Sequence, residues 1–279
     1  MLAPFLLFFV LFVVYPVLMT LLGSLSYQNL NTPSGWAGLA HFRYILTMDR
    51  HFRMALQNTV VFAAISTAVL TLLGLVVAVL LSQAGRPGRW LQALLVFPYT
   101  LSTVSVAMVW LAMLDRQSGM VNKALQLLGG ARVGWLEEPS LALYSLVFVH
   151  IWKYLGYCML IYLAGIQALP RELYEAATMD GAGERGKLLH VTLPALRPVI
   201  YFVLITTAVE SFKTFDLVRV MTDGNPLSNR TTTIVHQIYL RGFVNDYRRM
   251  DEASAMSVIL LLIVLAIALA GFRMNRPVE

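Results

Sequence analysis

The chain has 279 residues, of which 58% are hydrophobic and 13% charged, and its mean hydropathy is +0.69. Soluble domains are typically about 45–50% apolar and about 25% charged, so this composition excludes an ordinary soluble protein and indicates a membrane protein. The net charge of +6 comes from scattered residues without a basic face, which argues against nucleic-acid binding. Lone Cys158 excludes an intrachain disulfide, and the five histidines show no metal-ligand spacing.

Six stretches are long and apolar enough to cross a bilayer, which takes about 20 residues of helix. We therefore predict an all-α bundle of six transmembrane helices that forms a single domain, 1–279. The first stretch is too long for a signal-peptide core and has no basic residue before it, so we expect it to stay in the protein. The expected spans are Leu2–Leu25, Leu56–Leu81, Leu91–Leu114, Leu141–Ala168, Val199–Met221 and Ala253–Phe272.

The longest polar interruption between these spans is the loop 169–198, with the sequence LPRELYEAATMDGAGERGKLLHVTLPALRP. Pro170 and Glu172 suit the first turn of a helix, and Gly181 suits its left-handed end. A second short helix is expected from about Glu184 to Thr192, where Pro194 would halt it. The sequence thus predicts a helix-turn-helix element that is too polar to enter the bilayer.

The same loop resembles the "EAA" loop of the membrane subunits of binding-protein-dependent ABC importers. The resemblance is carried by Glu175-Ala176-Ala177, Gly181, Val191 and Leu193-Pro194, with Val191 in place of the more usual isoleucine. It implies docking on a cytoplasmic ATPase, and the two alanines and the Glu175 carboxylate suit such a contact. An ordinary amphipathic surface loop is the alternative. The expected coupling residues are Glu175, Ala176, Ala177, Asp180, Gly181, Leu193 and Pro194.

Other motifs resemble the carbohydrate-importing branch of that family. They include Asn58-Thr59, Phe97-Pro98-Tyr99, Gly119 with Asn122, and a turn at 222–226 that is similar to Thr-x-Gly-Gly-Pro except for Asn225. They look like the first permease type of the maltose, trehalose and glycerol-3-phosphate importers.

This resemblance implies a multi-pass protein of the cell (inner or plasma) membrane, in contact with membrane lipid and with both termini cytoplasmic. The implied partners are a second homologous permease, a cytoplasmic ABC ATPase dimer and an extracytoplasmic solute-binding protein. ATP and Mg²⁺ would be bound by the ATPase, so the chain itself is expected to be non-catalytic, with no cofactor and no metal. The solute is expected to be a sugar or a sugar-like compound. Its identity, and whether the ATPase is a homodimer or a heterodimer, stay open.

One motif imitates a phosphate-binding loop. The run Gly181–Lys187 satisfies the glycine and lysine positions of a P-loop, but Leu188 follows where a hydroxyl would hold Mg²⁺. A predicted helix, and no strand, precedes it. We therefore expect no ATP hydrolysis by this chain.

Charged residues inside the fifth expected span are candidates for the translocation pathway. Glu210, Lys213 and Asp216 are spaced by three, so neighbouring members could pair on one helix. Because an unpaired charge at the bilayer centre costs about 2.5–3.5 kcal/mol, they should face the bundle interior or a watery cavity. The two interpretations are a gate or pathway lining, and a buried ion-pair network that fixes helix packing.

Aromatic and basic residues at mid-membrane depth are the other pathway candidates. Tyr99, Trp152 and Lys153 could contact a sugar, because aromatic faces stack on sugar rings and polar groups bond hydroxyls. Packing or an interfacial belt is the alternative for each aromatic. No catalytic site is expected, since no nucleophile has a partner base. An importer for glycerol phosphate, an ion-coupled secondary transporter with the 210–216 charges as a proton relay, and a structural membrane scaffold are the alternative functions.

Overall fold

The computed structural model describes residues 3–27, 35–224, 230–244 and 249–274. Over these residues the chain is helical and the non-helical pairing is a single β-bridge between Ser26 and Trp36, so the predicted all-α class is confirmed. The helical elements in chain order are α1 (Ala3–Phe9), η1 (Val10–Val14), α2 (Tyr15–Ser24), α3 (Ala40–Thr47), α4 (Arg50–Ser82), α5 (Gly85–Thr100), α6 (Thr103–Met113), α7 (Met120–Leu127), α8 (Ala142–Gln167), α9 (Arg171–Met179), α10 (Glu184–Lys187), η2 (Leu188–Thr192), α11 (Leu193–Ala195), α12 (Arg197–Phe212), α13 (Asp216–Met221), α14 (Ile234–Tyr239), η3 (Leu240–Val244) and α15 (Met250–Met274).

In the part of the chain that the structure describes, four continuous helical stretches are long and apolar enough to cross a membrane, and up to six if each of two bent helix pairs is one span. The four are Pro4–Ser24, Arg50–Ser82, Ala142–Gln167 and Met250–Gly271. They correspond to four of the six predicted spans. The second begins six residues before the apolar run, at Arg50, because Asp49 caps it: one carboxylate oxygen accepts from the N–H groups of His51 and Phe52 at 2.9 and 3.1 Å.

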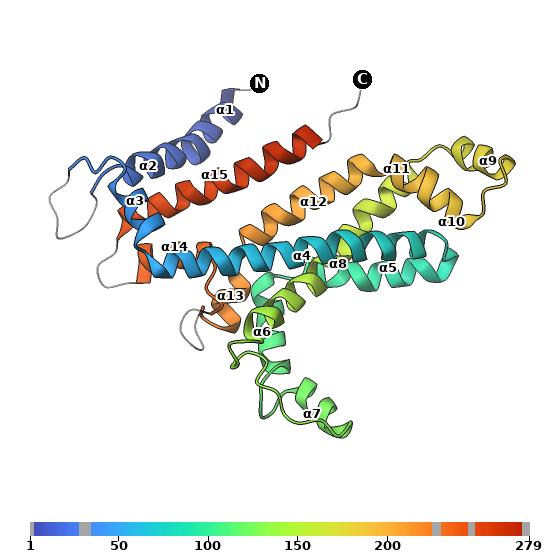
Figure 1. Cartoon of the computed structure of the whole chain (residues 1–279), viewed down its shortest axis with the longest axis horizontal. Helices are drawn as coiled ribbons and strands as arrows, with labels where there is room; N and C mark the ends of the chain where they lie inside the picture. Colours follow the sequence, from blue (N-terminus) through green and yellow to red (C-terminus); the bar gives the residue numbers. More distant parts are fainter. Residues whose placement is uncertain (1–2, 28–34, 225–229, 245–248, 275–279) are drawn as a thin grey trace.

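The third predicted span is not one helix. α5 and α6 meet at an angle of 99°, and the residues between them, Leu101 and Ser102, are extended. In Figure 1, α6 leaves the line of α5 and leads down to α7. The expectation of a single straight helix over Leu91–Leu114 is therefore wrong.

The fifth predicted span, Val199–Met221, is also wrong as a single helix. α12 ends at Phe212, and α13 begins at Asp216, after three intervening residues. The buried Thr233 hydroxyl donates to the Thr214 carbonyl at 3.0 Å, so a side chain from another segment takes an acceptor that a continuous helix would use. A further bend of 64° separates α12 from the loop that precedes it.

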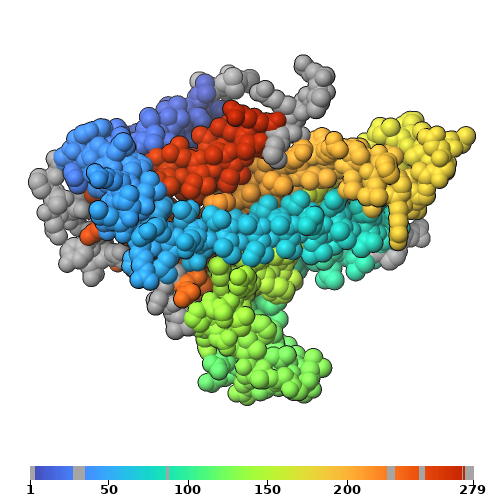
Figure 2. All heavy atoms as spheres, viewed as in Figure 1, coloured from blue at the N-terminus to red at the C-terminus, as the bar shows by residue number. Residues whose placement is uncertain are grey.

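The spans are arranged around α8, which packs against α4, α5 and α12 (Figure 1). One buried apolar cluster joins α4, α8 and α12, and a second joins α6, α8 and α13. A third joins α3, α4, α14 and α15, while α2 packs along α15. Two parts project from this body in Figure 2: the yellow segment with α9 and α10, and the green segment with α7.

Helices α5 and α8 approach closely at Gly156 of α8. A Cβ at this position would lie 2.0 Å from the Leu95 carbonyl oxygen of α5. Backbone cannot yield as a flexible side chain can, so only glycine lets the two helices meet at this distance.

We expect Gly156→Ala to destabilise the protein by about 1–3 kcal/mol, because the added methyl overpacks the α5–α8 contact. The measurement is the thermal midpoint in detergent after membrane extraction. The matched control is Gly183→Ala, since a Cβ at Gly183 meets no atom within 4 Å and its φ is −71°. A Gly156→Ala protein as stable as this control would contradict the described packing.

Candidate functional site

The loop between α8 and α12 is the first part of the site, and its first helix forms as predicted. α9 starts after Pro170, carries Glu172 in its first turn and ends before Gly181, whose φ is +80°. The Gly181 N–H donates to the Thr178 carbonyl at 3.0 Å, and the Ala182 N–H donates to the Ala177 carbonyl at 2.9 Å. These two bonds form a Schellman cap, which fixes where the helix ends.

The second half of the loop differs from the prediction. Pro194 does not halt the helix, because α10 continues through the π-helical turn η2 into α11, which includes Pro194. The Leu193 N–H bonds the Leu188 carbonyl, five residues back, and this wider turn separates the proline ring from the preceding turn. The two halves of the loop are joined by the Tyr174 hydroxyl and the Thr192 hydroxyl, 3.0 Å apart.

The predicted coupling residues fall into two groups. Glu175, Ala176, Ala177, Asp180 and Gly181 lie together on α9 and its cap, and all but the partly buried Ala177 are exposed. Leu193 and Pro194 lie in α11, beside the bend that leads into α12. The α9 group lies on the part that projects from the helix body (Figure 1), and Met179 at its end is 89% exposed. This projecting helix is accessible to a partner protein.

The second part of the site is the break between α5 and α6, which Lys153 of α8 closes. The Lys153 ammonium donates to the Leu101 carbonyl at 2.7 Å and to the Tyr99 carbonyl at 3.4 Å. A helix that ends inside a membrane leaves carbonyls without partners, and no water replaces them there. Lys153 is 3% exposed, so it supports the break and does not present its charge to a solute.

Aromatic rings surround this lysine. The ammonium lies 5.8 Å from the Tyr99 ring centre and 5.6 Å from that of Tyr154. Tyr99 also stacks on Tyr157, with ring centres 4.7 Å apart, and 38% of its surface remains exposed. Trp152, equally exposed, belongs to a different group, since it packs edge-on against Trp110 of α6 at 5.4 Å. The structure therefore brings Tyr99 and Lys153 together but places Trp152 apart from them.

Of the two interpretations of the 210–216 charges, the buried ion-pair network is not found among the residues that the structure describes. Glu210 and Lys213 form an ion pair of 3.0 Å, but their side chains are 45% and 55% exposed. Asp216 is also exposed and begins α13, beyond the break that follows Phe212. Pairing of all three charges required one continuous helix, and the helix ends at Phe212. These three residues instead lie exposed at the surface of the chain.

Reasoning from the sequence missed a buried ionic cluster at the α3–α14 end of the molecule. Arg241 pairs with Asp49 at 2.6 Å and also with Glu252, which in turn pairs with Arg249 at 2.7 Å. Asp49 at a helix start was a visible local signal, but its partner lies 192 residues away in the sequence. The Glu252 carboxylate raises the pKa of Arg249, so the Arg249 guanidinium stays charged. The cluster ties the start of α4 to the start of α15.

A polar junction explains Asn58-Thr59. The Asn58 amide donates to the Thr232 carbonyl at 3.0 Å, and the Thr59 hydroxyl accepts from the Ile234 N–H at 2.9 Å. α4 is thereby attached to the segment that follows the 222–226 turn. The predicted turn character is visible at Asp223 and Gly224, both with positive φ, while Asn225 and Pro226 fall outside the described residues.

Asn122 organises the projecting segment around α7. Its amide donates to the Val133 carbonyl at 2.9 Å, and its oxygen accepts from the Val133 N–H at 3.1 Å and from the Trp135 indole at 3.2 Å. In the preceding turn, the Ser118 hydroxyl and N–H bond the Asp115 carboxylate and lower its pKa. These hydrogen bonds hold the segment in a defined conformation, in which the Leu127 side chain is 89% exposed.

The apparent P-loop lies in the wrong structural context. Helix α9 precedes the Gly181–Lys187 run, and Lys187 is paired with Glu184 at 3.1 Å. A P-loop requires a strand before its glycines and a helix after them. Among the described residues there is also no group of three or more His, Cys, Asp or Glu side chains that could hold a metal.

Comparison with protein families gives a match over residues 70–279 to the family described as "Binding-protein-dependent transport system inner membrane component". The chain is 31% identical to the trehalose/maltose transport system permease protein MalF of Thermococcus litoralis, over 99% of this chain and 92% of that protein. It is 30% identical to the sn-glycerol-3-phosphate transport system permease protein UgpA of Yersinia pestis, over 86% and 80% of the two chains.

The fold is similar to a solved structure of a bacterial ABC transporter involved in the import of the acidic polysaccharide alginate. The TM-score is 0.87 at 25% sequence identity, over 100% of this chain and 94% of that one. A second structure of the bacterial alginate transporter, in complex with an alginate pentasaccharide-bound periplasmic protein, gives the same TM-score at 24% identity.

We expect Lys153→Met to destabilise the protein by about 1.5–3 kcal/mol, because it removes a charged donor from buried backbone carbonyls. Lys213→Met is the matched control and should change stability by less than about 0.5 kcal/mol, since Lys213 is exposed. Thermal midpoints of the two purified variants make the comparison. Equal midpoints would show that the α5–α6 break does not depend on Lys153.

Proposed function

The chain belongs to the family of binding-protein-dependent transport system inner membrane components, the permeases of ABC importers, and we propose that the solute it moves is a sugar or a sugar-like compound. As such a permease it is a non-catalytic, multi-pass inner membrane subunit. This family membership excludes the ion-coupled secondary transporter and the structural scaffold. The observation that supports a sugar is the exposed ring of Tyr99, which stacks on Tyr157, together with the exposed polar pair Glu210 and Lys213.

The charges near the pathway favour a neutral or polyhydroxylated solute over glycerol phosphate. A phosphate would require a cation that is free to bind it. The Lys153 ammonium is occupied by backbone carbonyls, and Lys213 is paired with Glu210. Glycerol phosphate remains the second candidate, because UgpA is 30% identical to this chain.

The proposed mechanism transmits ATPase closure through the loop 169–198. Glu175, Ala176, Ala177, Asp180 and Gly181 would contact the ATPase, and Leu193 and Pro194 would pass the movement to α12. The loop joins α8 directly to α12, and both helices pack on α4, so a pull on α9 acts on the helices that carry the pathway residues. Rigid-body rocking of this kind exposes a midplane site to each side in turn.

The remaining partners follow from this arrangement. ATP and Mg²⁺ would be bound by a cytoplasmic ABC ATPase dimer, while this chain binds neither. The loop and both termini would be cytoplasmic, and the segment around α7 would face the solute-binding protein. A second, homologous permease would cover exposed residues of the pathway, Tyr99, Trp152, Glu210, Lys213 and Asp216.

The substrate is tested with the reconstituted complex of both permeases, the ATPase and the solute-binding protein. We expect ATPase activity to rise with members of a panel of sugars and sugar oligomers and not with glycerol phosphates. Stimulation by glycerol phosphates alone would replace the sugar assignment with the second candidate.

We expect Glu175→Lys to abolish coupled uptake while the protein remains inserted, because charge reversal turns attraction into repulsion at the ATPase contact. Uptake and co-purification of the ATPase are measured together. Glu137→Lys, at an exposed position near α7, is the control and should leave the ATPase bound. Normal ATPase association and uptake by the Glu175 variant would remove the docking role.

A further inference from the structure

A polar cavity lies beneath the loop 169–198 and takes no part in the proposed transport mechanism. Its volume is about 560 Å³, within the range of about 300–1,000 Å³ that is typical of small-molecule sites. Three parts of the chain form its walls: the end of α4, the end of α8, and the loop itself. The lining residues used below are Gln83, Gln167, Arg171, Glu184 and Lys187.

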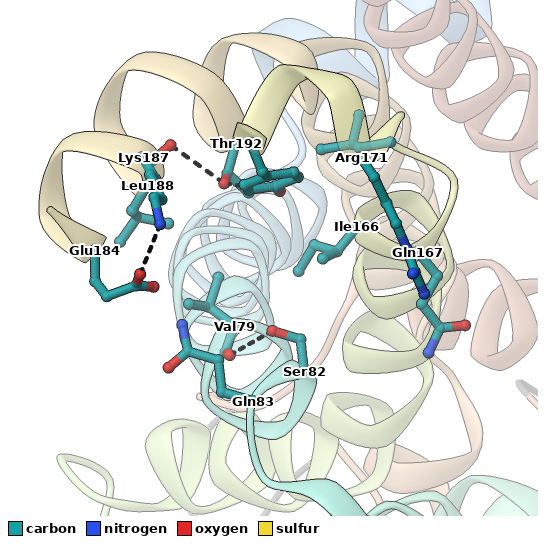
Figure 3. A pocket seen from close by; sticks show the side chains of 12 residues that line it. Val79, Ser82, Gln83, Ile166, Gln167, Arg171, Glu184, Lys187, Leu188 and Thr192 are labelled. Atoms are coloured by element: carbon teal, nitrogen blue, oxygen red, sulfur yellow. Dashed lines mark hydrogen bonds and ion pairs between the residues drawn. The ribbon is translucent and has the colours of Figure 1, made fainter. Parts of the chain in front are cut away.

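Cationic side chains enter the cavity from two opposite sides. Figure 3 shows Arg171 and Gln167 on one wall and Lys187 with Glu184 on the facing wall. Arg171 has no ion pair or hydrogen-bond partner among the described side chains, so its guanidinium donors are available. Lys187 is largely covered, with 19% of its side chain exposed, whereas its partner Glu184 is 75% exposed. The amides of Gln83 and Gln167 add neutral donors.

Apolar side chains also line the cavity, and Figure 3 shows Leu188 beside Lys187 and Ile166 beside Gln167. Val79 and Ile166 come from the last turns of the spans α4 and α8, and Leu169 and Leu188 continue this surface. The polar donors come from the loop and from the ends of the spans. An amphiphile with an anionic head matches this mixed lining, whereas a small soluble ion would leave the apolar side chains without a partner.

We infer that the cavity lies at the depth of lipid headgroups from where the spans beside it end. The two spans that line it end there, at Ser82 and Gln167, and the polar loop begins. Trp90, close by in sequence at the start of α5, is 82% exposed, as expected for a residue at the membrane interface. Basic pockets between transmembrane helices at the cytoplasmic surface bind the headgroups of anionic lipids.

We propose that this cavity binds the phosphate group of an anionic phospholipid of the cytoplasmic leaflet, with Arg171 as the unpaired cation and Lys187, whose charge Glu184 offsets, on the facing wall. The proposal rests on the proposed function, which places the loop on the cytoplasmic side. Arg171 and Tyr174 line the cavity from the first turns of α9, while the expected ATPase contacts begin at Glu175 and extend to the far end. A lipid bound here bridges the loop to α4 and α8 and stiffens the lever that the ATPase pulls.

The test measures retention of phosphatidylglycerol by the assembled complex after extraction from mixed phosphatidylcholine and phosphatidylglycerol bilayers, by native mass spectrometry. Wild type is expected to retain phosphatidylglycerol in preference to phosphatidylcholine. Arg171→Gln should reduce this retention about fivefold, the effect of one basic residue at an anionic membrane surface. Glu184→Gln should increase it, because the substitution releases Lys187 for the phosphate.

Arg185→Gln is the matched control, since Arg185 is an exposed residue of the same loop that does not line the cavity. Equal retention by wild type, Arg171→Gln and Glu184→Gln would overturn the proposal. Inorganic phosphate is the second probe: if it stabilises the complex in pure phosphatidylcholine while no phosphatidylglycerol is retained, the lipid assignment is wrong.

Uptake by the same preparations separates this proposal from the proposed function. Retention that depends on Arg171, in a complex that imports no sugar, would contradict the function and leave the lipid site standing. Normal sugar import, with lipid retention unchanged by Arg171→Gln and Glu184→Gln, would support the proposed function and contradict the lipid site.

Discussion

A membrane offers no water to an open backbone carbonyl, and this constraint governs how the chain can interrupt its helices. The break between α5 and α6 leaves such carbonyls, and the Lys153 ammonium bonds the one at Leu101 at 2.7 Å. One turn further along α8, Gly156 lets α5 approach to backbone contact. A single helix therefore supplies both the donor and the space that the bend requires. Tyr99 lies two residues before Leu101, and the Lys153 ammonium bonds its carbonyl at 3.4 Å and lies 5.8 Å from its ring centre.

α8 also connects this bend to the loop that is proposed to meet the ATPase. It ends at Gln167, and α9 begins four residues later. The loop returns to α12, and α12 contacts α8 again where the Ser211 hydroxyl lies 3.4 Å from His150. The loop is thus held by two helices that are packed on a common neighbour, α4. A rigid connection of this kind can carry a movement from α9 to the residues around Tyr99 without any change in helix structure.

Much of the fold could be predicted from the sequence, because apolar length and local capping residues determine it. The spans α4, α8 and α15 contain long uninterrupted apolar runs, and Pro170 and Gly181 mark the ends of α9. The breaks at Leu101 and at Lys213–Phe215 could not be predicted. Each depends on a hydrogen bond from a distant segment, Lys153 in one case and Thr233 in the other.

The candidate site was predictable to a similar extent. The coupling residues of α9 share one short motif and lie together. The pairing expected among Glu210, Lys213 and Asp216 assumed that one helix carries all three, but α12 ends at Phe212. Asp49 is recognisable from the sequence as a helix cap, but its pairing with Arg241 is not, because side chains so far apart in sequence meet only through tertiary packing.

The central claim is that α9 meets the ATPase and that α7 lies at the other surface of the membrane. Cys158 is fully buried and is the one cysteine of the chain, so single cysteines can be introduced without removing it. The most direct measurement is crosslinking of Met179→Cys and of Leu127→Cys in the assembled complex, both positions being 89% exposed. We expect Met179→Cys to crosslink to the ATPase and Leu127→Cys to form no such product. A crosslink from Leu127→Cys to the ATPase, with none from Met179→Cys, would contradict the account.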